Sequence, residues 1–250
     1  MNFDSDLHVH TFRSPCGKDE MIPGDILRVA LDRGLDKIAI TDHFYPMTDP
    51  FELEETRQAF EEAQFLTGNP IELFFGCEAE VMGPGRTAGS AELAESLDFV
   101  MAGATHFQNK GITDFPEGLD VVEKALYILQ TFQYAVSLPW VDVIAHPFFV
   151  HPNVLTPGAV DILENFQLRP ALEIAKENGI AMEMSRRIFH MPEQLIFSAR
   201  FYALCKEIGL RFTIGSDAHQ LEDIGNIRVL RPFIKEMGLT EADFWMPEHR

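Results

Sequence analysis

The sequence is short of basic residues, of cysteine and of long apolar runs, and each shortage excludes a class of protein. Lys and Arg number 20 against 39 Asp and Glu in 250 residues, a formal charge of −19 at pH 7. A chain this acidic offers no basic surface to phosphate backbones or anionic lipid, so we expect neither a nucleic-acid nor a membrane partner. Its apolar runs are shorter than the roughly 18 residues of a membrane span. Three cysteines are too few for a disulfide framework and fit a reducing cytoplasm.

Short apolar runs alternate along the chain with segments of helical spacing. The runs predict seven buried strands, at residues 6–10, 37–41, 71–77, 99–104, 141–145, 180–184 and 211–214. Helices are expected between them, the first with an apolar stripe at residues 26–31 before Gly34, and the others at residues 53–66, 119–136, 160–178 and 192–208. Such alternation favours a parallel sheet with helical crossovers, and seven units predict an α/β fold that closes, or nearly closes, into a barrel.

One domain over residues 1–250 is expected, because no Ser/Gly/Pro-rich linker divides the chain. The alternative architecture is an open, doubly wound sheet. That fold commonly carries a Gly-x-Gly-x-x-Gly loop after its first strand, and none follows here.

Metal-ligand residue types follow most of the predicted strands. Functional side chains of parallel barrels gather where the strands end. Six of the nine histidines lie at such points, which scattered surface histidines would not do. The candidate metal ligands are His8, His10, His43, Glu78, His106, His146, Asp217 and His219.

Two pairs of these candidates share a spacing. His8 and His10 are two residues apart, as are Asp217 and His219, and residues two apart on a strand point to the same face. In a closed barrel the last strand neighbours the first, so the pairs would face each other. Glu78 follows an apolar run, where a carboxylate is costly unless it is paired or bound to metal. Eight imidazole and carboxylate candidates exceed the about four ligands of one zinc, so we expect two or three Zn²⁺, Mn²⁺ or Fe²⁺ ions.

The motifs DLHVHT, ITDH, GCE, ATH, AHP and GSDAH, in this order, resemble those of the PHP (polymerase and histidinol phosphatase) superfamily. The resemblance extends from residue 8 to residue 219. It implies a distorted (β/α)7 barrel with a di- or trinuclear metal centre. The ligand sets it implies are His8, His10, Glu78 and Asp217 for one cation, Glu78, His106 and His146 for a second, and His43 and His219 with one further ligand for a third.

The further ligand is where this sequence departs from the family pattern. Histidinol-phosphatase-like members have a histidine six residues after the His-x-His pair, and Cys16 stands there in this chain. A thiolate can bind zinc. Glu20 or a water molecule are alternative ligands, and Cys16 as a small packed residue is the alternative without metal.

The resemblance and the residues together predict a metal-dependent phosphoesterase, a hydrolase acting on a small phosphorylated metabolite. A hydroxide activated between the cations would attack phosphorus, with Glu78 and Asp217 as catalytic residues. Arg186 and Arg187 follow the sixth strand, and one of them, preferably Arg187, would bind the substrate phosphate. Alternatively, both pair with surface carboxylates. The alternative functions are hydrolysis of an amide or another ester, and a non-catalytic metal-binding module.

Overall fold

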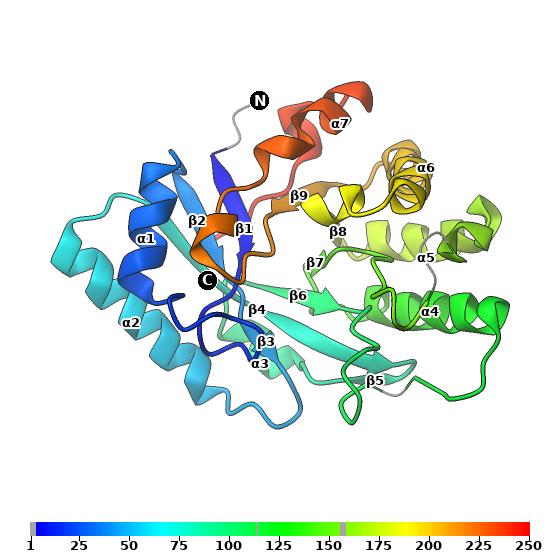
Figure 1. The fold of residues 1–250 in the computed structure, drawn as a ribbon, viewed down its shortest axis with the longest axis horizontal. Helices are drawn as coiled ribbons and strands as arrows, with labels where there is room; N and C mark the ends of the chain where they lie inside the picture. The colour runs from blue at the N-terminus through cyan, green and yellow to red at the C-terminus, as the bar shows by residue number, and fades with distance from the viewer. Residues whose placement is uncertain (1–3, 114, 156–158) are drawn as a thin grey trace.

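The computed structural model describes residues 4–113, 115–155 and 159–250, and within them seven parallel strands form a nearly closed barrel (Figure 1). All seven predicted strands are confirmed, and each pairs with the next in chain order. They are β1 (Ser5–Val9), β2 (Lys37–Ile40), β4 (Glu72–Gly83), β6 (Phe99–Gly103), β7 (Val143–Ile144), β8 (Ala181–Ser185) and β9 (Phe212–Gly215).

The barrel closes where the segment after β9 meets β1. The amide of Asp217 donates to the carbonyl of His8 (2.9 Å), and the amide of His10 donates to that of Ala218 (3.0 Å). Near the start of β1, the Asp6 carboxylate accepts from the amide of Ser216 at 2.8 Å. These bonds set the His8–His10 stretch beside the residues that follow β9, as the sequence predicts for a closed barrel.

Helices cover the outside of the barrel (Figure 1). Their bounds are α1 (Pro23–Asp32), α2 (Phe51–Thr67), α3 (Ala91–Glu95), α4 (Val121–Val136), α5 (Asn165–Glu177), α6 (Pro192–Ile208) and α7 (Arg231–Glu236). Single 3₁₀ turns are η1 (Ala159–Ile162), η2 (Arg186–Phe189), η3 (Leu221–Asp223), η4 (Arg228–Leu230) and η5 (Glu241–Asp243). The helix expected at 160–178 is divided into η1 and α5, because a capping box of Glu164 and Gln167 starts a new helix at Asn165.

Strand β4 is longer than expected, and it carries two short partners. The strand β3 (His43–Phe44) pairs with its middle, so that His43 lies opposite Glu78. The strand β5 (Arg86–Thr87) returns along its far end as an antiparallel hairpin. The turn between β4 and β5 is therefore held by strand pairing on both sides.

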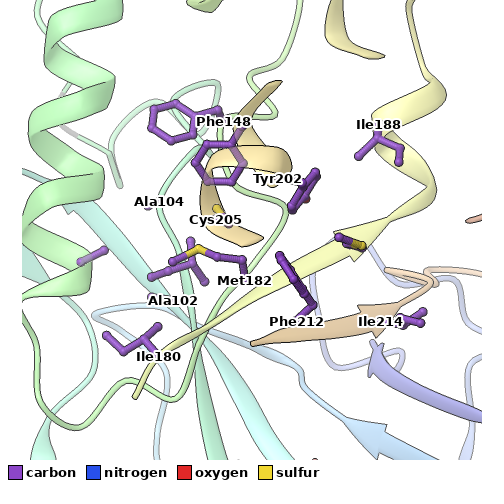
Figure 2. Close-up of a cluster of buried hydrophobic side chains, with 14 of the residues drawn as sticks. Ala102, Ala104, Phe148, Ile180, Met182, Ile188, Tyr202, Cys205, Phe212 and Ile214 are labelled. Carbon is purple, nitrogen blue, oxygen red and sulfur yellow. The ribbon is translucent and has the colours of Figure 1, made fainter. Parts of the chain in front are cut away.

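Apolar side chains pack on both surfaces of the barrel wall. Outside it, Met182 and Phe212 of β8 and β9 meet Tyr202 and Cys205 of α6 (Figure 2). Inside it, near the end where the strands begin, a second cluster consists of Leu7, Ala39, Phe74, Phe99, Met101, Val143, Ala145 and Ala181. We call this end the amino end of the barrel and the opposite one the carboxyl end.

The C-terminal segment crosses the amino end. Trp245 packs against the inner apolar cluster, and its amide donates to the carbonyl of Phe212 (2.8 Å). Farther along, the guanidinium of Arg250 reaches the Asp142 carboxylate at 2.9 Å. Apart from η5, the segment after residue 238 contains no helix or strand.

Candidate metal centre

Glu78, in the middle of β4, lies at the centre of the predicted ligands. The residue is 1% exposed, and its two carboxylate oxygens face different imidazoles. Oε1 lies 3.1 Å from Nε2 of His146 and 3.7 Å from Nε2 of His106. Oε2 lies 3.0 Å from Nδ1 of His43. A glycine at position 103 makes room, because a Cβ there would come within 2.8 Å of Oε1. The two oxygens of one carboxylate thus face different groups of imidazoles.

The two pairs from the barrel seam meet beside Glu78, as their spacing predicts. The Nε2 atoms of His8 and His10 lie 3.0 Å apart. Oδ1 of Asp217 is 3.3 Å from Nε2 of His10 and 3.7 Å from that of His8. The ring of His219 stacks on His10 with centroids 4.4 Å apart. The structure therefore brings all eight predicted ligands together at the carboxyl end.

Although some of these atoms lie close together, several buried ones have no partner with hydrogen-bond geometry among the described residues. They are Nδ1 of His43, Nε2 of His146, Oε1 and Oε2 of Glu78, and Oε1 of Glu80. Buried polar groups without partners are rare, and close-set imidazole nitrogens and carboxylate oxygens are the donors that divalent transition metals prefer. The ligand atoms form overlapping groups of three within 4.8 Å, namely His8, His10 and Asp217; His43, Glu78 and His106; and His10, His43 and His219. These residues fit a site for divalent metal.

The acidic ligands are held in their ionised form. Burial alone would raise the pKa of the Glu78 carboxyl, but the imidazoles of His106 and His43 hold it well below its ordinary value. Burial acts in the same way on Asp217, and the guanidinium of Arg187 holds that pKa well below its ordinary value. Both carboxylates are therefore ready to bind cations at neutral pH.

The side chains of Arg187 and Arg186 bind different carboxylates. Nε of Arg187 donates to Oδ2 of Asp217, and its guanidinium lies 5.0 Å from the ring centroid of Phe149. Arg186 instead pairs with Asp223 at 2.6 Å. Of these two arginines, only Arg187 is among the described residues that line the cavity over the cluster.

This cavity has a volume of about 680 Å³ and opens directly over the ligands. Its floor contains imidazoles of the cluster together with Asp217. Its walls carry both apolar and polar side chains, among them Tyr45, Met47, Leu53, Gln108, Asn109 and Phe149. A small organic molecule could reach the cluster from here.

Of the two candidates for the remaining ligand, Cys16 borders this cavity, whereas Glu20 accepts a hydrogen bond from the amide of Leu221 at 3.2 Å. Burial would raise the pKa of the Cys16 thiol, but hydrogen bonds with His219 and His43 lower it to about 6.

Two carboxylates outside the predicted set support the ligands from behind. Glu183 of β8 accepts from Nδ1 of His8 (2.8 Å) through Oε1 and from the amide of His146 (2.6 Å) through Oε2. Glu80 lies 3.0 Å from Nδ1 of His106. Both carboxylates belong to fully buried residues. Such partners fix the tautomer and the orientation of a metal-binding imidazole. The signal that could have found them is an acidic residue inside an apolar strand, at even spacing from other inward residues.

Asp42 has the position that a turn-forming residue takes. Its carboxylate accepts from the amide of Thr11 (2.7 Å) and from the hydroxyl of Ser14 (2.7 Å). Ser14 in turn lies 3.1 Å from Nδ1 of His10. Asp42 therefore fixes a loop that holds a ligand.

A parallel barrel with histidines and carboxylates at its carboxyl end is an architecture that metal-dependent hydrolases use. The chain belongs to the PHP domain family, whose family model matches residues 6–187. This match confirms the family that the sequence motifs indicate.

Relatives and solved structures agree with the family. A probable phosphatase of Vibrio campbellii is 24% identical over 253 residues, covering 97% of this chain and 88% of that protein. One of a Thermoanaerobacter species is 27% identical over 242 residues, covering 94% and 87%. The crystal structure of histidinol phosphate phosphatase from Lactococcus lactis, with zinc, L-histidinol and phosphate, shares the fold at a TM-score of 0.71. That similarity covers 95% of this chain and 94% of the other at 19% identity. The predicted class, a metal-dependent hydrolase, is confirmed.

No helix in the described ranges has the length and apolar character needed to span a membrane.

Proposed function

We propose that this protein is a phosphatase that hydrolyses a small phosphomonoester with two or three divalent cations bound around Glu78. The observation that carries the proposal is the convergence of buried, unpartnered imidazole and carboxylate atoms on the floor of an open cavity. The relatives named probable phosphatases support the type of bond. L-Histidinol phosphate is one candidate substrate, because the structural neighbour from L. lactis is a histidinol phosphate phosphatase. The shortage of cysteine favours a cytoplasmic location, which stays a prediction.

The ligand sets follow from the grouping of the side chains. His8, His10 and Asp217 would hold one cation with Glu78. The other oxygen of Glu78 would reach a second cation, and the imidazoles 3.1 and 3.7 Å from it are those of His146 and His106. When bound, such cations lower the pKa of water toward neutrality and offset the charge on phosphoryl oxygens.

The chain's own residues contribute charge and orientation. Asp217, kept ionised by Arg187, can accept a hydrogen bond from the attacking water, but it is a poor proton donor to the leaving group. The guanidinium of Arg187 offers further N–H donors, in a planar fork that matches phosphate geometry. The walls of the cavity would hold the rest of the substrate.

An assay of phosphate release tests the proposal. A chromogenic phosphomonoester and a panel of phosphorylated metabolites, including L-histidinol phosphate, are incubated with protein loaded with Zn²⁺ or Mn²⁺. We expect phosphate release that chelation abolishes. Hydrolysis of carboxylic esters or amides without phosphate release would instead indicate another metallohydrolase. Metal uptake without turnover of either panel would indicate a non-catalytic module.

The two arginines provide a matched pair for the phosphate contact. Arg187→Ala is expected to raise KM by about 10-fold or more, the scale of a lost hydrogen bond to a charged group. Arg186→Ala should leave KM unchanged, because its partner is Asp223. KM of both variants is measured by steady-state kinetics with the best substrate of the panel. Equal effects of both substitutions would remove Arg187 from the substrate site.

A further inference from the structure

The loop of residues 11–17 is fixed tightly against the metal cluster. On one side the hydroxyl of Ser14 donates to Asp42 (2.7 Å) and accepts from the amide of His43 (3.1 Å). A Cβ at Gly17 would lie 2.0 Å from the carbonyl oxygen of Thr11, so only glycine lets the chain turn back here. The loop is therefore a built part of the site rather than a free surface segment.

The end of this loop is fixed to the opposite side of the cluster. The amide of Lys18 donates to the carbonyl of His219 at 2.9 Å. Cys16 thus lies between a contact to His43 and a contact to His219. Its side chain lines the same cavity as the imidazoles of His43 and His219.

The imidazole of His43 supplies an independent sign of a ligand. The residue is only 8% exposed, and within the described part of the chain its Nδ1 has no hydrogen-bond partner. Ligand atoms of His43, His219 and His10 lie within 4.8 Å of one another. Imidazole nitrogens therefore gather at the rim of the cluster, and the solvent-exposed Cys16 borders the same cavity.

We propose that Cys16 supplies a thiolate to this rim position together with His43 and His219, and that the thiolate makes the position selective for thiophilic cations. Thiolates favour Zn²⁺ and its softer neighbours, whereas Mn²⁺ and Mg²⁺ prefer carboxylate and water. Binding releases the thiol proton to solvent and forms one metal–sulfur bond. The inference rests on the proposed function only in that the cluster around Glu78 binds metal.

Cobalt substitution reports the metal–sulfur bond directly. Apoprotein loaded with Co²⁺ is expected to show a thiolate-to-cobalt charge-transfer band in the near ultraviolet, besides the weaker visible bands of the ion. Cys16→Ser should lose the charge-transfer band and keep visible absorption from the other ions. The control is Cys205→Ala, which removes a sulfur of α6 that is buried in the core, and this variant should keep the band.

The outcomes separate this inference from the proposed function. Visible cobalt absorption without a charge-transfer band in the wild type would show a metal centre that excludes Cys16, and would overturn the inference alone. No uptake of cobalt, zinc or manganese would overturn the metal centre itself and both proposals with it.

Competition between metals tests the selectivity. Apoprotein is dialysed against equal concentrations of Zn²⁺ and Mn²⁺ and analysed for metal content. In Cys16→Asp, the ratio of bound manganese to bound zinc at the rim position is expected to rise by about 10-fold or more. Even outer-shell partners change metal affinity on this scale. An unchanged ratio would show that the thiolate does not select the metal.

Discussion

The inward face of β4 changes from apolar to charged along its length. Phe74 lies in the inner apolar cluster at the amino end, and Glu78 and Glu80, at even spacing from it, lie in the metal centre. Strand β8 repeats the change within two residues, from Ala181 to Glu183. Residues two apart share a face, so one row of side chains serves both regions.

The two ends of the barrel differ in what their contacts satisfy. At the amino end, apolar side chains pack on one another and Trp245 covers them. At the carboxyl end, both oxygens of Glu78 and two imidazole nitrogens are buried without partners among the described residues. Burial of such atoms costs stability unless cations bind them. The amino end therefore stabilises the fold, whereas the unpartnered atoms of the carboxyl end destabilise it but form a binding site.

Removing the charge of Glu78 should have the largest effect on activity and on metal-dependent stability. Glu78→Gln keeps the shape of the side chain but loses the bridging carboxylate. Phosphate release is expected to fall by more than the roughly 10–100-fold that an outer-shell substitution costs. The wild type should gain about 4 kcal/mol of stability at a free metal concentration of 1,000 times Kd. The variant should lose most of that gain, measured as the melting temperature with and without chelator.

Chelated wild type is the control for this variant, because it separates loss of metal from misfolding. A Glu78→Gln protein that still melts higher when metal is added, by as much as the wild type, would remove Glu78 from the centre.

A substitution that creates a cavity at the amino end should lower the stability of the fold without lowering its metal content. Phe99 is fully buried, and its ring meets Trp245 with centroids 5.6 Å apart. Phe99→Ala is expected to lower the free energy of unfolding by about 3–5 kcal/mol. The metal content per folded molecule should stay that of the wild type. Denaturant melts and elemental analysis of the same samples check both statements, and metal loss without a loss of stability would contradict the separation of the two ends.

The sequence was most informative where local patterns carry the structure. Apolar runs predicted the seven barrel strands, and the spacing of His8 and His10, like that of Asp217 and His219, predicted two pairs that meet at the seam. The position of the candidate ligands could be predicted without knowing any long-range contact, because parallel strands bring their carboxyl ends together.

What the sequence did not reveal depends on distant contacts. The two-residue strands β3 and β5 exist only because β4 is there to pair with them. The path of the C-terminal segment is set by Phe212 and Asp142, which are remote in sequence from Arg250. Glu183 could not be told from an ordinary strand-end residue, since its partner His8 lies 175 residues away.

Glu183 offers a sharper test of the carboxyl end, with a smaller expected effect. In Glu183→Gln the side-chain oxygen can still accept from the amide of His146, but the other group becomes an NH₂ donor facing Nδ1 of His8. That donor favours the tautomer of His8 with its proton on Nε2, the atom beside His10 and Asp217. We expect metal affinity to fall about 10–100-fold with the fold intact.

Nitrogen NMR of the His8 ring would show the proton on Nε2 in this variant and on Nδ1 in the wild type. Glu177→Gln, at the exposed end of α5, is the matched control. An unchanged tautomer with lowered metal affinity would mean that Glu183 acts by packing alone.

The smallest effects should come from the segment that covers the amino end, and they resolve what kind of contact matters there. Trp245 is partly buried against the apolar cluster, so Trp245→Ala is expected to cost about 1–3 kcal/mol of stability. Arg250 pairs with Asp142 at the surface, with 43% of its side chain exposed, so Arg250→Ala should cost at most about 1 kcal/mol. Raising the salt concentration should shrink the Arg250 effect and leave the Trp245 effect in place, because exposed charges are screened and apolar burial is not. If Arg250→Ala lowers the free energy of unfolding more than Trp245→Ala does, the amino end is held by charge. The two ends of the barrel would then differ in having paired and unpaired charges, and not in having apolar and polar interiors.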